Sequence, residues 1–456
     1  MRTNTARKVA PVFTHEGGRS PVIDVKQQLA RRVSACMLWD DQFYESGEAT
    51  AKEIYSLALR CPPAFVANLA ISARSELNLR HVPLLLLVAL AKTGSGSRLV
   101  SDTVAAVVQR ADEIGELLAI YWKVQPDASL SAQLKRGLAL AFAKFGEYAL
   151  AKYDRDGEIK LRDVMRLVHP KPIDEARSGL YQRVVKRTLA TPDTWETELS
   201  GGADKKATFE RLIAEDKLGY LALLRNLRGM AEAGVDPVTI KAAIRARKGG
   251  AQRVMPFRYL AALRAAPQFA DALDDAMIAS VEESAGFDGL TVVMVDVSSS
   301  MRHKVTAKSE LTRMDAAAAI AALIKGERRV FSFSDSLIEV PAYNGMALID
   351  SVMRSQMHGG THLFDAVDVV NRSVRYSRII VITDEQAADD SQRHGGIQGT
   401  LDKMPAPHAG AKAYVINVGA YANGVGFGPW VTISGFSEAV LSYIRAVEAE
   451  SVASNG

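Results

Sequence analysis

Hydroxyl and carboxylate side chains gather in one short segment of the sequence, Asp296-Val297-Ser298-Ser299-Ser300, directly after an apolar run. Two later segments carry Thr361 and Asp384, whose side chains also offer a hydroxyl or a carboxylate oxygen. Together the three segments give five candidate metal ligands: Asp296, Ser298, Ser300, Thr361 and Asp384. Such hard oxygen ligands suit Mg²⁺, which prefers octahedral oxygen coordination, few protein ligands and retained waters. Neutral hydroxyls leave the ion with positive charge and an open position, which an acidic side chain of a partner protein could fill.

A second group of residues carries positive charge along a helix that the sequence predicts from about residue 159. Arg162 and Arg166 are four residues apart and share one helical face, and His169 follows three residues later. Lys152 and Lys171 flank this face. Guanidinium groups in a line can bind successive phosphates of a nucleic acid, each through two hydrogen bonds.

Each group also has an ordinary structural interpretation. The D-x-S-x-S string alone is also typical of a polar loop that caps the next helix. A charged helical face is often only solvated, and Asp163 can neutralise Arg166 at i,i+3 spacing. His169, which precedes Pro170, can simply end a helix.

The elements that must position these residues are of two kinds. From about residue 24 to 280, apolar residues recur at helical spacing between turn signals, which predicts stacked helical hairpins. From about residue 285, strands alternate with helices, in the order strand 289–296, helix 314–324, strand 329–333, helix 363–373, strands 378–383 and 413–418, and helix 437–448. This order predicts a doubly wound parallel sheet, in which the loops that carry Asp296, Thr361 and Asp384 meet at the carboxyl edge.

Composition limits the protein class. The chain has 456 residues, enough for two domains, with 48% hydrophobic and 24% charged residues, which is ordinary globular composition. The net charge of +4 divides into +9 over residues 1–280 and −5 over residues 281–456. With two cysteines, no apolar leader and no apolar run above ten residues, we expect a cytoplasmic protein without a membrane anchor.

The segment from residue 285 resembles the von Willebrand factor A domain, because the five oxygen-bearing residues match its metal-ion-dependent adhesion site without departure. The helical part resembles the TROVE module, whose signature is similar to five stretches of this chain: 152–153, 162–172, Trp195-Glu196, 223–227 and 253–257. A TROVE module followed by an A domain is similar to the Ro autoantigen family and its bacterial members, and Ile433-Ser434-Gly435-Phe436 also fits.

This resemblance implies a multidomain α and α/β fold, in which a HEAT-like helical-repeat ring is followed by a doubly wound α/β von Willebrand factor A domain. Its expected parts are a polar tail (1–21), the TROVE ring (22–282), the A-like domain (285–450) and a frayed tail (451–456). The implied cofactor is Mg²⁺ or another divalent cation at the adhesion-type site.

The resemblance also implies a function. Family members bind a small noncoding Y RNA on the outer surface and the single-stranded ends of misfolded RNA in the central hole. Bacterial members are associated with polynucleotide phosphorylase, an exoribonuclease, through the Y RNA. The residues at the family's RNA-contacting positions are Lys152, Arg162, Arg166, His169 and Lys171.

Two other functions remain open at this point. The competing hypothesis is a metal-dependent module that captures an acidic protein ligand and uses the helical ring as a platform without RNA. Catalysis is not expected, because a metal nuclease needs a carboxylate-rich site with a general base or a second metal, whereas hydroxyls dominate here. We expect a monomeric protein.

Overall fold

A computed structural model gives the fold, and it describes residues 12–13, 19–20, 24–34, 46–94, 96–154, 157, 159–254, 257–282, 286–305, 311–387, 403–419, 425–426, 428–434, 440–441, 444–445 and 448. Two compact units divide the chain. The helical unit lies within Cys36–Asp40 and Gly47–Ala276, and the sheet unit within Met1–Ala35, Asp41–Ser46 and Met277–Gly456. Helical repeats in one unit and an α/β sheet in the other confirm the expected fold class.

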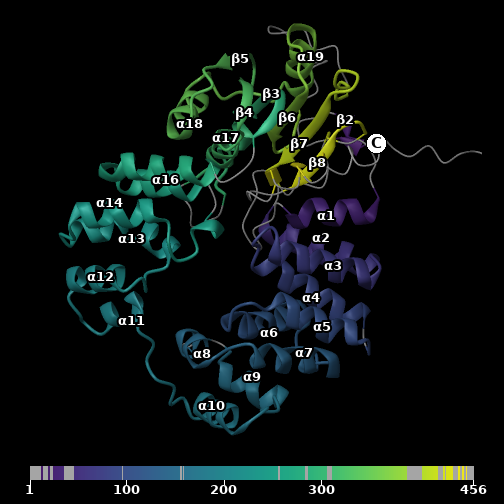
Figure 1. The fold of residues 1–456 in the computed structure, drawn as a ribbon. Coiled ribbons are helices and arrows are strands. Elements are labelled where there is room, and N and C mark those ends of the chain that lie inside the picture. The colour runs from purple at the N-terminus through teal and green to yellow at the C-terminus, as the bar shows by residue number, and fades with distance from the viewer. Residues whose placement is uncertain are drawn as a thin grey trace, which may run out of the picture. The chain divides into compact units, whose positions relative to one another are not determined.

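The helical unit follows the predicted pattern of short helices with short connections (Figure 1). Its helices are α2 Gly47–Arg60, α3 Pro63–Ser75, α4 His81–Thr93, α5 Arg98–Val107, α6 Asp112–Val124, α7 Ala132–Ala143, α8 Glu147–Tyr153, α9 Leu161–Val168, α10 Glu175–Lys186, α11 Trp195–Ser200, α12 Lys205–Ala214, α13 Tyr220–Glu232, α14 Pro237–Ala246 and α15 Phe257–Ala265, and α16 Ala270–Glu282 runs on across the limit of the unit. Side chains of the residues just before several helices fix where they begin: Asp174, Asp204 and Asp236 each accept a backbone N–H from the first turn.

Stacking of neighbouring helices forms the core of this unit. Helices two apart in the chain contact each other, as α2 does with α4, α3 with α5, and α5 with α7. The apolar run Val82–Ala91 lies in α4 and is buried along its whole length. It is therefore a core helix, and none of the described helices is long and apolar enough to cross a membrane.

The sheet unit contains six strands in the order β5-β4-β3-β6-β7-β8. They are β3 Phe287–Asp296, β4 Gly326–Phe333, β5 Leu337–Val340, β6 Arg378–Thr383, β7 Lys412–Asn417 and β8 Val431–Ser434. All neighbours are parallel except the edge strand β5, which runs antiparallel to β4. Helices α17 Arg313–Ala322, α18 Gly345–Met353 and α19 Leu363–Ser373 complete the described part of the unit.

The central strands bury both of their faces. Val292 and Met294 of β3 pack in one cluster with Leu363 and Val367 of α19. Because side chains alternate along a strand, Val293 and the other odd-numbered residues point to the opposite face, and α17 contacts β3 and β6. The sheet therefore lies between two helical layers, as expected for a doubly wound fold.

The N-terminal part of the chain differs from the expected division at residue 22. Helix α1 Val25–Ser34 groups with the sheet unit, and it contacts β8. The reason is a buried ion pair: Arg31 donates to the carboxylate of Glu385, which follows β6. Of the two expected tails only β1 Val12–Phe13 and β2 Arg19–Ser20 are described, as a short antiparallel pair. Gly435-Phe436, Met255-Pro256 and most of the predicted helix 437–448 lie outside the described residues.

Candidate nucleic-acid interface and metal site

Parallel strand pairing brings the predicted metal ligands to one edge of the sheet. Val295 of β3 lies beside Ile382 of β6, so Asp296, the last residue of β3, and Asp384, which follows β6, lie at the ends of adjacent strands. The hydroxyl of Thr383 donates to the Asp296 carboxylate and links the two strand ends directly.

Ser298 and Ser300 lie on the loop that leaves β3, whereas Thr361 lies between α18 and α19. The Ser298 N–H donates to Asp296 Oδ1 over 2.9 Å, and the hydroxyl oxygens of Ser298 and Ser300 are 3.4 Å apart. The Ser299 N–H donates to the Gly359 carbonyl over 2.9 Å, which brings the Thr361 loop to the same place.

The first of the two glycines before Thr361 packs closely against the Asp335 side chain. A Cβ on Gly359 would lie 1.6 Å from Oδ2 of Asp335, so a larger residue there would displace the Asp335 carboxylate. The same carboxylate accepts the Gly360 N–H over 2.8 Å, and Ser334 Oγ accepts the Gly359 N–H over 2.8 Å. These contacts hold the backbone that presents Thr361.

The electrostatics of this site favour a bound cation. All five predicted ligands are fully buried. Burial raises the pKa of Asp296, and repulsion from the Asp384 carboxylate raises it further. The Thr361 hydroxyl is buried and has no hydrogen-bond partner among the described residues. A cation with oxygen ligands would satisfy both the hydroxyl and the carboxylates, so the residues fit Mg²⁺.

A buried arginine also faces this site. Arg313, at the start of α17, is 2% exposed, and its Nη1 lies 3.5 Å from Oδ2 of Asp384. It therefore places positive charge beside one of the two carboxylates that a divalent ion would use.

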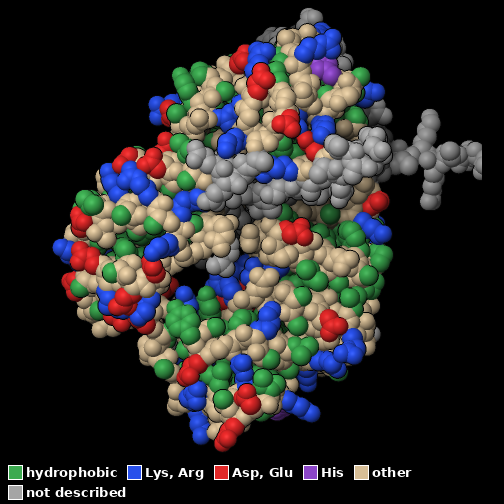
Figure 2. Space-filling model, in the orientation of Figure 1, with side chains coloured by type: hydrophobic (Ala, Val, Ile, Leu, Met, Phe, Trp, Pro, Cys, Tyr) green, Lys and Arg blue, Asp and Glu red, His purple; other side chains and the backbone are tan. Residues whose placement is uncertain are grey.

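The predicted basic face on α9 is present but uneven. Arg166, His169 and Lys171 are exposed, whereas Arg162 is half-buried and its Nε lies 3.5 Å from Asp163 Oδ1. Asp163 therefore pairs with Arg162, whereas the sequence suggested Arg166. His169 ends α9 in the left-handed conformation, with φ of 48°, which confirms its interpretation as a C-cap. On the face shown in Figure 2, basic and acidic side chains lie interspersed over the α9–α10 end.

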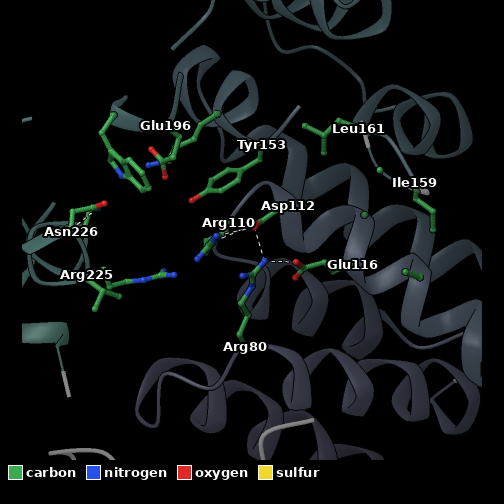
Figure 3. Close-up of a pocket in the computed structure, with 17 residues that line it drawn as sticks. Arg80, Arg110, Asp112, Glu116, Tyr153, Ile159, Leu161, Glu196, Arg225 and Asn226 are labelled. Carbon is green, nitrogen blue, oxygen red and sulfur yellow. Dashed lines mark hydrogen bonds and ion pairs between the residues drawn. The ribbon is translucent and has the colours of Figure 1, made fainter. Parts of the chain in front are cut away.

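Lys152 is placed differently from the other four predicted RNA-contacting residues. It lines a cavity of about 730 Å³ inside the helical unit, and those four residues do not line it. The cavity walls come from α6, α8, α9, α11 and α13 and from residues just before α4 and α6. They carry side chains of three kinds: the cations Arg80, Arg110, Lys152 and Arg225, the aromatics Tyr153 and Trp195, and the acids Asp112, Glu116 and Glu196 (Figure 3).

The four cations of this cavity are not equivalent. Arg80 binds Asp112 at 2.6 Å and also pairs with Glu116, and Arg110 binds Asp112 at 2.8 Å. Lys152 and Arg225 have no carboxylate within ion-pair distance in the described part of the chain. Their charge is therefore available to an anionic ligand.

Each aromatic side chain of the cavity packs against neighbouring side chains. The Arg110 guanidinium lies over the Tyr153 ring at 4.8 Å from its centre, and Lys152 lies 5.9 Å from the same centre. Trp195 stacks on Phe209, with ring centres 6.3 Å apart. Single-stranded nucleic acids bind where their bases can stack on aromatic rings and cations can contact their phosphates, and this cavity offers both.

Sequence reasoning found only part of this cavity. It singled out Lys152, the pair Trp195-Glu196 and the stretch 223–227, which contains Arg225, but no local pattern connects them with Arg80. The lining residues are spread along the chain from Arg80 to Asn226, and only the stacking of the helices brings them together. A metal cluster of three or more His, Cys, Asp or Glu side chains is absent among the described residues.

Comparison with solved structures supports the same architecture. A crystal structure of the RO (RSR) protein of Deinococcus radiodurans superposes with a TM-score of 0.57 at 16% identity, and the match covers 92% of this chain and 98% of that chain. At this identity the likeness shows a shared fold.

Sequence comparison gives the family. A stretch of 66 residues is 36% identical to telomerase protein component 1 of Rattus norvegicus and of Mus musculus, and it covers 14% of this chain and 2% of those proteins. The family described as TROVE domain matches residues 29–189 and 172–329, about two thirds of the chain. This chain therefore belongs to the TROVE-domain family.

Proposed function

We propose that this chain is an RNA-binding scaffold, in line with the RNA binding for which the TROVE family is known. The observation that carries the proposal is the cavity of the helical unit, where Lys152 and Arg225 have no carboxylate partner among the described residues and lie beside the aromatic rings of Tyr153 and Trp195. A single RNA strand fits this chemistry, because its phosphates bind cations and its bases stack on aromatic rings.

Each kind of side chain has its own task in this cavity. Lys152 and Arg225 bind phosphate oxygens and so hold the backbone of the strand. The exposed faces of Tyr153 and Trp195 stack on the bases. Arg110 is already held by Asp112, so it orients the Tyr153 ring more than it attracts RNA. The ligand that we infer for the cavity is the single-stranded end of a misfolded RNA.

The exposed residues of the α9 end form a second, weaker interface in this proposal. Arg166, His169 and Lys171 are exposed and have no ion pair among the described residues, while Arg162 is partly neutralised by Asp163. This surface would bind the helical part of a small, Y-like noncoding RNA through its phosphates. Through that RNA the chain would tether an exoribonuclease such as polynucleotide phosphorylase. The scaffold itself would be a cytoplasmic monomer and would catalyse no chemical step.

The adhesion-type site would serve a protein partner. Asp296, Ser298, Ser300, Thr361 and Asp384 would hold Mg²⁺, which supplies a positive charge with an open coordination position. An acidic side chain of a partner protein would complete the coordination. The observation that favours this second function is the buried hydroxyl of Thr361, which has no hydrogen-bond partner among the described residues.

Variants of the cavity, of the α9 surface and of the adhesion-type site can be compared in one RNA-binding assay. The cavity variant Lys152→Ala with Arg225→Ala should weaken binding of a single-stranded oligonucleotide and spare a structured RNA. The surface variant Arg166→Glu with Lys171→Glu should do the opposite. Asp296→Ala should leave both RNA affinities unchanged and abolish divalent-ion binding. Unchanged RNA binding in both charge variants would sink the RNA proposal and favour the protein-binding module.

A further inference from the structure

Of the three acidic residues that line the cavity, Glu196 is the one without an ion-pair partner among the described residues. Glu196, in the first turn of α11, faces the cavity beside Trp195 (Figure 3). Its Oε2 atom is buried and has no hydrogen-bond partner among the described residues, and none of their cations forms an ion pair with it. Its neighbour Glu198 on the same helix differs, since it lies 3.7 Å from Arg211.

An unsatisfied buried carboxylate oxygen is costly, so its presence needs a reason. Phosphate cannot supply one, because a phosphate oxygen carries no proton and repels a carboxylate. A ligand with N–H or O–H groups can. Asn226 adds a second acceptor to the wall, because its amide nitrogen already donates to the Ala222 carbonyl over 2.8 Å.

We propose that Glu196 reads the base of a bound nucleotide and makes the cavity prefer guanine. This inference rests on the proposed RNA binding and adds a specificity to it. Guanine presents two adjacent donors on its Watson–Crick edge, N1–H and the N2 amino group, and they match the two oxygens of one carboxylate. Adenine and cytosine present one amino group beside an acceptor nitrogen, and uracil presents one N–H between two carbonyl oxygens, so each offers the carboxylate one donor and at least one repulsive neighbour.

The surroundings of Glu196 suit this role. Trp195 and Glu196 line the same cavity, so a base that stacks on the indole ring lies in the same space as the Glu196 carboxylate. Lys152 and Arg225 lie in the same cavity and can hold the phosphates on either side of that base. Bases of single-stranded RNA are commonly read in this way, by stacking together with hydrogen bonds to the Watson–Crick edge.

The test compares uridine oligonucleotides that carry a single guanosine, inosine or adenosine. Inosine keeps N1–H and lacks only the N2 amino group. We expect the wild-type protein to bind the guanosine strand about tenfold more tightly than the inosine strand, equivalent to about 1.4 kcal/mol. Glu196→Gln should bring this ratio close to one, whereas the control Glu198→Gln should leave it unchanged.

The outcomes separate the inference from the function on which it rests. If no oligonucleotide binds, the RNA proposal fails. If all three strands bind the wild-type protein equally, the base-reading role is wrong, and this comparison needs no variant to fold. If Glu196→Gln changes only the ratio between ribose and deoxyribose strands, the carboxylate binds the 2′-hydroxyl and guanine selection is again wrong.

Discussion

Removal of the two unpaired cations of the cavity should change how RNA affinity depends on salt. The perturbation is Lys152→Ala combined with Arg225→Ala. Both residues line the cavity, and neither has a carboxylate partner among the described residues. Each cation that binds a phosphate releases condensed counterions, and for single strands this contributes about 0.7 to the slope of log affinity against log salt.

The expected change follows from this count of two cations. The slope for a single-stranded oligonucleotide should become shallower by about 1.4. Between 50 and 200 mM salt the wild-type protein should therefore lose about sevenfold more affinity than the double variant. The measurement is a filter-binding or fluorescence-anisotropy titration at four or more salt concentrations.

A matched control uses a cation of the same unit outside the cavity. Arg245 pairs with Asp271 and Asp275, so Arg245→Gln should leave the slope unchanged. If the double variant keeps the wild-type slope while it still binds the strand, Lys152 and Arg225 do not touch phosphate, and the assignment of this cavity is wrong.

Two further predictions concern the metal site. Thr361→Val should abolish the thermal shift that Mg²⁺ produces but should not destabilise the metal-free protein, because the hydroxyl has no hydrogen-bond partner among the described residues; a loss of metal-free stability in calorimetry would contradict this. Arg313→Met should raise the Mg²⁺ affinity about tenfold in an isothermal titration, because the guanidinium lies 3.5 Å from Asp384 and repels a second cation. An unchanged or weaker Mg²⁺ affinity would show that Arg313 does not compete with the metal ion for the Asp384 carboxylate.

Local patterns were sufficient to predict most of the sheet unit. The strand over 378–383 and the helix over 363–373 have the observed bounds of β6 and α19, because continuous apolar runs and helical periodicity are local properties of the sequence. The sequence analysis did not identify β5, α18 or β8. Strands β5 and β8 have four residues each, so they carry too short a pattern to be distinguished from a loop.

These local patterns could not predict features that depend on contacts between residues far apart in the sequence. Asp296 and Asp384 could be predicted as neighbours because they lie at strand ends, which a doubly wound sheet must align. The cavity depends on helices that stack across more than a hundred residues of chain, and no spacing rule relates Arg80 to Arg225. Whether Lys152 has a carboxylate partner among the described residues likewise depends on its neighbours in space, so the sequence could indicate the cation but not its availability.

The position of α1 shows why the metal-site loop cannot be understood from its own segment. Glu385 follows the predicted ligand Asp384 directly and takes the left-handed conformation, with φ of 59°. This conformation is unusual for a residue with a side chain and must be held by its contacts. Arg31 supplies one of them, 354 residues away in sequence, and the Gly426 N–H supplies another over 2.7 Å. Since both contacts are buried, the geometry of Asp384 depends on an N-terminal helix that the sequence alone assigns to the helical repeats.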